Sequence, residues 1–78
     1  MAEERFFVGD EVKLVGVNRH GKNRVRENGE WWEVVTVDGG DSSILSTKIC
    51  VEPMSGTGNW RWIDIPEDRD MRIVEHVM

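Results

Sequence analysis

The chain lacks the features that identify secreted, membrane-anchored and disulfide-stabilised proteins. It contains a single cysteine, Cys50, among 78 residues, so no internal disulfide can form and a reducing cytoplasm is the expected compartment. No apolar run approaches the roughly 20 residues of a membrane span. The N-terminal residues 1–5 lack the charged and then apolar regions of a signal peptide. These absences predict a soluble cytoplasmic protein with no membrane partner.

Motifs for catalysis, metal binding and cofactor binding are also missing. The two histidines are far apart in the sequence, and together with Cys50 they match no known zinc-site spacing. Glu67, Asp68 and Asp70 lack the glycine and the terminal glutamate of a calcium loop, so a solvated acidic turn is expected there. The chain contains neither a phosphate-binding loop nor a dinucleotide fingerprint. We therefore expect no catalytic residues, no metal and no cofactor, and the protein is predicted not to be an enzyme.

The size and composition favour one small β domain over residues 1–78, with residues 1–7 as a flexible N-terminus. A chain of this length buries only about 60% of its unfolded surface, so its core depends on a few large side chains. Four tryptophans and two phenylalanines can supply that core. Eight glycines and frequent valine and isoleucine favour strands joined by turns over helices.

The first half of the sequence predicts a strand, a loop and a tight hairpin. Residues 11–17 alternate apolar and charged side chains, as a half-buried strand does. Residues 18–22 read as a loop in which Gly21 can adopt a positive φ. The Asn28-Gly29 dipeptide is the strongest local signal in the chain, because a type I′ hairpin turn requires positive φ at both central positions.

That hairpin would separate the two adjacent tryptophans. It pairs Val25 with Trp32 and Arg26 with Trp31, so the two rings point to opposite faces of the sheet. We expect Trp32 in the core and Trp31 exposed beside Arg24 and Arg26.

Val35 and Val37 lie an even number of residues after Trp31. In a flat strand they would therefore share the exposed face of Trp31 instead of pointing into the core. Either a bulge near residues 33–34 or a bend into a second half-barrel would bring them inward. Residues 38–42 and 55–59 are rich in glycine and polar residues and predict turns. Between them a strand over residues 43–54 would point Ile49 and Val51 into the core.

The end of the chain predicts a strand over residues 60–65, a turn opened by Pro66 and a short last strand. If Ile63 is buried, Trp60 and Trp62 lie on the outer surface, and this register avoids burying Asp64 without a partner. The opposite register, with both tryptophans in the core, remains an alternative.

Five short strands, a long charged first loop and the ending W-R-W-I-D-I-P-E-D-R-D-M-R-I-V resemble an SH3-like barrel. The resemblance implies an all-β, five-stranded SH3-like barrel with a short 3₁₀ turn before the last strand. It concerns layout rather than motif, and Tudor and KOW domains share that layout. Since the chain has no tyrosine, it lacks the A-L-Y-D-Y-like motif with which SH3 domains bind proline-rich peptides. Compact acidic chains of this kind also resemble orphan products of phage and bacterial genomes.

The net charge of −5 conceals a strong asymmetry. Residues 12–26 carry five positive charges and no negative one, whereas the rest of the chain has five positive and fifteen negative charges. A locally anionic partner would fit this segment, and so would a plain solvated basic loop. The acidity of the remainder argues against a nonspecific grip on DNA.

Exposed tryptophans beside arginines suit protein interfaces and unpaired bases alike. The candidate partner-binding residues are Arg19, Lys22, Arg24, Arg26, Trp31, Trp60, Arg61 and Trp62. We expect a monomeric, non-catalytic binding module or regulator that acts on a protein partner. A KOW-like nucleic-acid accessory that uses the basic loop 19–26 is the alternative. A Tudor-like reader, which would enclose a methylated cation between tryptophan rings, is a further one.

Overall fold

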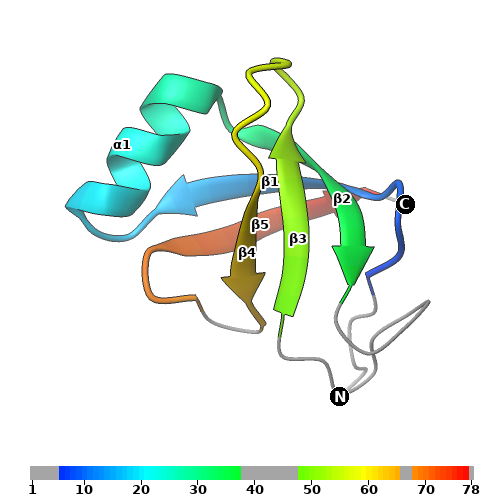
Figure 1. Cartoon of the computed structure of the whole chain (residues 1–78). Helices are drawn as coiled ribbons and strands as arrows, with labels where there is room; N and C mark the ends of the chain where they lie inside the picture. The colour runs from blue at the N-terminus through cyan, green and yellow to red at the C-terminus, as the bar shows by residue number, and fades with distance from the viewer. Residues whose placement is uncertain (1–5, 38–47, 66–67, 78) are drawn as a thin grey trace.

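The computed structural model describes residues 6–37, 48–65 and 68–77, which form a curved antiparallel sheet and one helix (Figure 1). The sheet order is β4-β3-β2-β1-β5, so β4 and β5 are the two edge strands. The elements are β1 (Glu11–Gly16), α1 (Arg19–Asn28), β2 (Trp31–Val37), β3 (Lys48–Pro53), β4 (Arg61–Asp64) and β5 (Met71–Val77). The expected small, five-stranded, all-β barrel is confirmed. The turn predicted at 38–42 and the first part of the predicted third strand lie outside the described residues.

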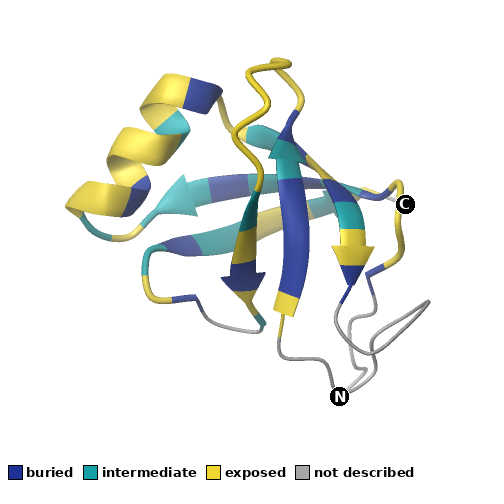
Figure 2. Cartoon of the chain, in the orientation of Figure 1, coloured by how far each residue is buried: buried dark blue, intermediate teal, exposed yellow. Residues whose placement is uncertain are grey.

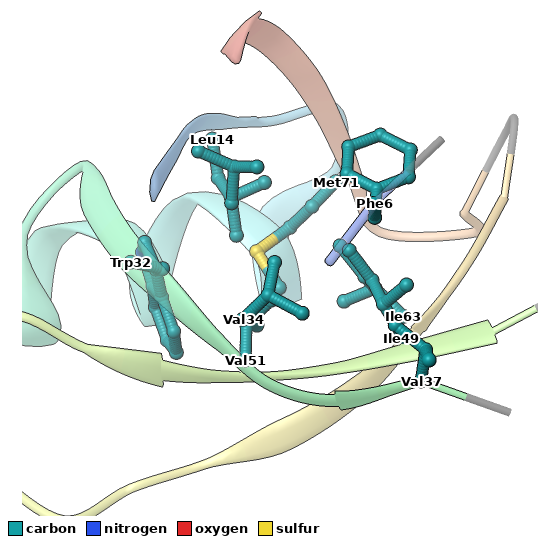
Figure 3. Close-up of a cluster of buried hydrophobic side chains, with 10 residues drawn as sticks. Phe6, Leu14, Trp32, Val34, Val37, Ile49, Val51, Ile63 and Met71 are labelled. Atoms are coloured by element: carbon teal, nitrogen blue, oxygen red, sulfur yellow. The ribbon is translucent and has the colours of Figure 1, made fainter. Parts of the chain in front are cut away.

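The hydrophobic core fills the concave side of this sheet (Figure 3). Trp32, Ile49, Val51 and Ile63 are all buried there, as the strand alternation predicts. The indole Nε1 of Trp32 donates to the carbonyl of Gly29 at 3.0 Å, so the ring is buried without an unpaired donor. The cluster consists of Phe6, Val12, Leu14, Trp32, Val34, Val37, Ile49, Val51, Ile63 and Met71.

An irregularity in β2 resolves the parity of its valines. The β2–β3 register shifts between Val34 and Thr36, which leaves Val35 outside the paired positions. The bulge therefore lies one residue beyond the predicted site. It allows Trp32, Val34 and Val37 to be buried together, although a flat strand would point Val37 to the other face.

The segment predicted as a loop and a hairpin is instead the ten-residue helix α1, and this correction has a clear local cause. The side-chain oxygen of Asn18 accepts from the backbone N–H of Gly21 at 2.8 Å and caps the helix N-terminus. At the other end Gly29 has a φ of 92°, and its N–H donates to the carbonyl of Val25. The Asn28-Gly29 pair thus ends a helix instead of forming a hairpin turn. The structure pairs Trp32 with Val12 of β1, not with Val25.

Gly21 is helical and does not adopt the positive φ expected of it. Its role is a close approach, because a Cβ built on Gly21 would lie 1.8 Å from the carbonyl oxygen of Asp70. A Cβ on Gly16 would similarly lie 2.2 Å from the backbone nitrogen of Lys22. These two glycines therefore let α1 pack directly on β1 and on the turn before β5. The helix is short and polar, and no helix among the described residues could span a membrane.

Of the N-terminal segment 1–7, which the sequence predicts to be flexible, the structure describes only Phe6 and Phe7. Phe6 is only 2% exposed and belongs to the core, and its ring stacks on His76 of β5 at a centroid distance of 4.5 Å. The Nε2 of His76 lies 2.7 Å from the Oδ2 of Asp10, and that same oxygen accepts from the Phe7 N–H. The large ring and this buried pair attach residues 6 and 7 to the barrel.

Asp68 holds the turn before β5. The sequence predicts a solvated acidic turn here, but the structure buries Asp68. Its carboxylate accepts backbone N–H groups from Asp64 at 2.9 Å, Asp70 at 2.8 Å and Met71 at 3.2 Å. Residues 66 and 67 lie outside the described residues. Among those described around this turn, none has the predicted 3₁₀ conformation.

Candidate binding cleft

A cleft of about 420 Å³ lies between α1 and the start of β4, and we call it the α1–β4 cleft. Its volume is within the usual range of ligand-binding sites. Figure 1 shows the two elements that border it, together with the long turn that leads into β4. The cleft is lined by His20, Arg24, Asn59, Trp60, Arg61, Trp62 and Asp70.

Helical geometry decides which residues of α1 reach the cleft. His20 and Arg24 are four residues apart, so they lie on one side of the helix and line the cleft. Gly21, Val25 and Asn28 form the side that packs on the barrel, and Figure 2 shows the rest of α1 largely exposed. Three further basic residues follow the i, i+3, i+7 spacing of a separate, solvent-exposed face, which we call the basic stripe: Arg19, Lys22 and Arg26. The basic segment therefore forms two surfaces.

Asn28 fixes the turn that carries Asn59 and Trp60 into the cleft. Asn28 is 2% exposed, and its Oδ1 accepts from the Thr57 hydroxyl at 2.7 Å and from the Asn59 amide at 3.0 Å. Its Nδ2 donates to the carbonyl of Arg24 at 2.9 Å, and its own carbonyl accepts from the Ser55 hydroxyl. One buried amide thus joins the end of α1 to residues 55–59, which places Trp60 opposite the helix.

A polar chain across the open side of the half-barrel contributes to the cleft. Arg61 of β4 reaches Asp70, the residue before β5, with an Nη2–Oδ2 distance of 3.4 Å. The other carboxylate oxygen of Asp70 accepts from the Asn18 side-chain amide at 2.7 Å. This amide chiefly holds the pKa of Asp70 below its usual value; burial acts in the opposite direction, and Arg61 adds to the lowering. Asp70 is therefore an anion that Arg61 and Asn18 already engage.

The guanidinium of Arg61 retains unused hydrogen-bonding capacity. Its contact with Asp70 is longer than the 2.7–2.9 Å usual for charge-assisted hydrogen bonds. Its Nε is buried and has no hydrogen-bond partner among the residues that the structure describes. A buried N–H without an acceptor is destabilising. A ligand acceptor that shifts the guanidinium and satisfies its N–H groups would therefore bind favourably.

Two tryptophan rings remain accessible at the cleft. Trp60 is 60% exposed and Trp62 is 42% exposed, which confirms the expected register of this strand. The cause is the alternation along β4, in which Ile63 enters the core and its neighbour Trp62 points to the other face. Exposed apolar patches that polar groups surround mark contact sites, whereas single exposed apolar residues do not.

The structure brings together four of the eight candidate residues predicted from sequence: Arg24, Trp60, Arg61 and Trp62. The basic stripe lies on another face of α1, and Trp31 is half-buried on β2, outside the cleft lining. Sequence reasoning missed His20, Asn59 and Asp70. The i, i+4 spacing of His20 and Arg24 would have linked those two, but only if the segment had been recognised as a helix.

The lining of the cleft combines arginine, histidine, asparagine and tryptophan side chains with one carboxylate, that of Asp70. Among residues 6–37, 48–65 and 68–77 no group of three metal-ligating side chains comes together. Cys50 is buried on β3 opposite Trp62, and burial raises the pKa of its thiol, with the charge of Glu52 adding to the effect.

Comparisons with known proteins supply no relative for this chain. No protein-family model matches it, and searches of curated proteins and of solved structures return no significant match.

Proposed function

We propose that the protein is a non-catalytic binding module that holds a segment of a partner protein in the α1–β4 cleft. The observation that carries the proposal is the convergence of two exposed tryptophans with Arg24 and Arg61 in one cleft. Tryptophan and arginine are the side chains that contribute most to protein interfaces, because they combine large contact area with directed hydrogen bonds. A cleft of this size fits a short segment of chain.

The first test is selection of displayed random peptides on the immobilised wild-type protein. Every selected peptide is then measured against a Trp60→Ala/Trp62→Ala double variant. We expect binding to the double variant to fall at least tenfold, since two aromatic contacts are lost. The matched control is Trp31→Ala, which removes a partly exposed tryptophan outside the cleft. Selection of no peptide, or of peptides that bind the double variant as tightly as the wild type, contradicts the proposal.

A second candidate function, nucleic-acid binding of the KOW type, is supported by the basic stripe Arg19, Lys22 and Arg26. The acidity of the remaining chain makes it the weaker candidate, since everything outside residues 12–26 carries a net charge of −10. Amide NMR titration with single-stranded and duplex oligonucleotides at about 20 and about 200 mM salt separates the two. Binding through phosphates falls steeply with added salt, whereas a tryptophan-anchored peptide depends on salt much less.

A reader of methylated cations has less support. The cleft contains Arg24 and Arg61, and these positive charges disfavour a cationic ligand between the rings. The one carboxylate of the lining, that of Asp70, already accepts from Asn18 and Arg61.

A further inference from the structure

We propose that the α1–β4 cleft binds its ligand as an added β-strand, an extended peptide with an acidic residue directly beside an apolar or aromatic one. This inference rests on the proposed function and specifies the ligand. The peptide pairs with the outer edge of β4 at Trp62, its carboxylate lies among the basic groups of the cleft, and its apolar side chain lies against the tryptophans.

The backbone of β4 supplies the first argument. β4 is an edge strand, and its Asp64 N–H donates to the carboxylate of Asp68 at 2.9 Å, away from β3. In an antiparallel pair, the residues that face the partner strand alternate with residues that face away from it. Trp62 has the same parity as Asp64, so its N–H and C=O also point away from β3.

No backbone partner for Trp62 occurs on that side among the described residues. Trp62 also lines the cleft, so the unpaired edge and the cleft adjoin each other. An extended peptide can therefore hydrogen-bond to the N–H and C=O of Trp62 while its side chains occupy the cleft. Addition of a strand to an exposed sheet edge is a general mode of peptide recognition.

Charge determines the acidic residue of the ligand. Arg24 and Arg61 line the cleft against a single carboxylate, Asp70, which Asn18 and Arg61 already engage. The long Arg61–Asp70 contact and the unpaired Nε show that this guanidinium has N–H groups left to donate to a further carboxylate. An aspartate or glutamate side chain supplies that carboxylate as a single negative charge. A nucleic acid would also bring an extended phosphate backbone, which the acidic remainder of the protein would repel.

Alternation along the added strand determines the neighbouring residue. Arg61 and Trp62 are successive residues of β4, so their side chains point to opposite faces. A peptide beside them presents its own successive side chains in the same alternating way. If the acidic residue faces Arg61, the adjacent residue faces the exposed ring of Trp62, where an apolar or aromatic side chain buries the most surface.

The experiment uses the whole chain of residues 1–78 and the peptides recovered by the selection described above. For each peptide, affinity is measured by isothermal titration for the parent, for an Asp→Asn or Glu→Gln version, and for versions carrying a single backbone N-methyl group. We expect the amide replacement to weaken binding about tenfold. N-methylation at positions of one parity should abolish binding, and at the other parity it should have little effect, because only alternate N–H groups face β4.

Two protein variants form a matched pair that tests which arginine binds the carboxylate of the peptide. Arg24→Gln should reduce the preference for aspartate over asparagine, whereas Arg26→Gln on the basic stripe of the same helix should leave it unchanged. Both residues are exposed, so neither substitution should impair folding, and urea denaturation checks this.

The outcomes separate this inference from the function on which it rests. Selected peptides that require Trp60 and Trp62, but lack an acidic residue or tolerate N-methylation everywhere, overturn the added strand and leave the binding module standing. Equal effects of Arg24→Gln and Arg26→Gln overturn the assignment of the carboxylate to the cleft. Failure to select any tryptophan-dependent peptide overturns both proposals, and salt-sensitive oligonucleotide binding would then identify a nucleic-acid ligand.

Discussion

Replacement of Gly21 by alanine tests the packing of α1, because two physical effects predict opposite signs. In an exposed helix interior, Gly→Ala stabilises by about 1 kcal/mol, since alanine loses less backbone entropy on folding. In this structure the added Cβ would lie 1.8 Å from the carbonyl oxygen of Asp70. Ordinary contact begins at 3.4 Å, so the helix or the turn before β5 must move by about 1.6 Å.

The required movement breaks identifiable interactions. The Asp70 carbonyl accepts from the Val17 N–H at 2.8 Å, and the Asp70 carboxylate accepts from the Asn18 amide at 2.7 Å. Overpacking typically costs about 1–3 kcal/mol, and each weakened hydrogen bond about 1 kcal/mol. After subtraction of the propensity gain, we expect Gly21→Ala to lower the free energy of unfolding by about 2–4 kcal/mol. That is a large part of the roughly 4–12 kcal/mol typical of a domain this size.

Urea denaturation, followed by tryptophan fluorescence and by circular dichroism, measures this difference. With an m-value of about 1–2 kcal/mol per molar urea, the midpoint should fall by at least about 1 M. Asn23→Ala is the matched control, since Asn23 lies on the exposed part of the same helix and should change stability by less than about 0.5 kcal/mol. A Gly21→Ala protein as stable as the wild type, or more stable, would refute the close packing of α1 on the turn.

Three further predictions concern the helix end, the cleft carboxylate and the buried thiol. Gly29→Ala should destabilise by about 1–3 kcal/mol in the same urea assay, because its φ of 92° and ψ of 174° suit only glycine. A Cβ at this position would contact nothing, so the loss comes from backbone strain alone. The lowered pKa of Asp70 stabilises the fold above the ordinary value of 3.8, and this contribution is lost as pH falls from there through the folded pKa. Acid titration of stability should therefore be shallower for Asp70→Asn than for the wild type, and equal slopes would contradict the assignment. Cys50 should react with a thiol reagent only as fast as the protein opens, so rapid modification of the native protein would show that the site is accessible.

The strands could be predicted from the sequence because alternation is a property of neighbouring residues. Ile49 and Val51 alternate with Lys48, Cys50 and Glu52, and both are buried. Ile63, which stands between Trp62 and Asp64, is also buried. The helix could not be predicted in this way. Its only large apolar residue is Val25, and it contains a glycine, so no apolar stripe marks the segment. What stabilises α1 is its cap and its contact with a turn about fifty residues away.

The Asn28-Gly29 pair shows why a strong local signal can predict the wrong structure. Both a type I′ turn and a helix end place glycine at positive φ, so the dipeptide alone fits either structure. The choice depends on Asn28, whose side chain bonds back to Arg24 and across to the turn at 55–59. The partners at 55–59 are distant in sequence from Asn28. The cleft likewise combines residues from three separate segments.

The cleft and the closure of the barrel share one set of interactions, and this affects how variants must be interpreted. The chain from Arg61 through Asp70 to Asn18 joins β4, the turn before β5 and the start of α1. A substitution at Asp70 therefore changes both the stability and the position of Arg61, and a loss of binding would not distinguish the two. Arg24 contributes to the fold through its backbone carbonyl, which Arg24→Gln retains. If Arg24→Gln loses binding of the acidic peptide while its stability is unchanged, the loss comes from the missing charge. That result would show that Arg24 binds the carboxylate of the ligand.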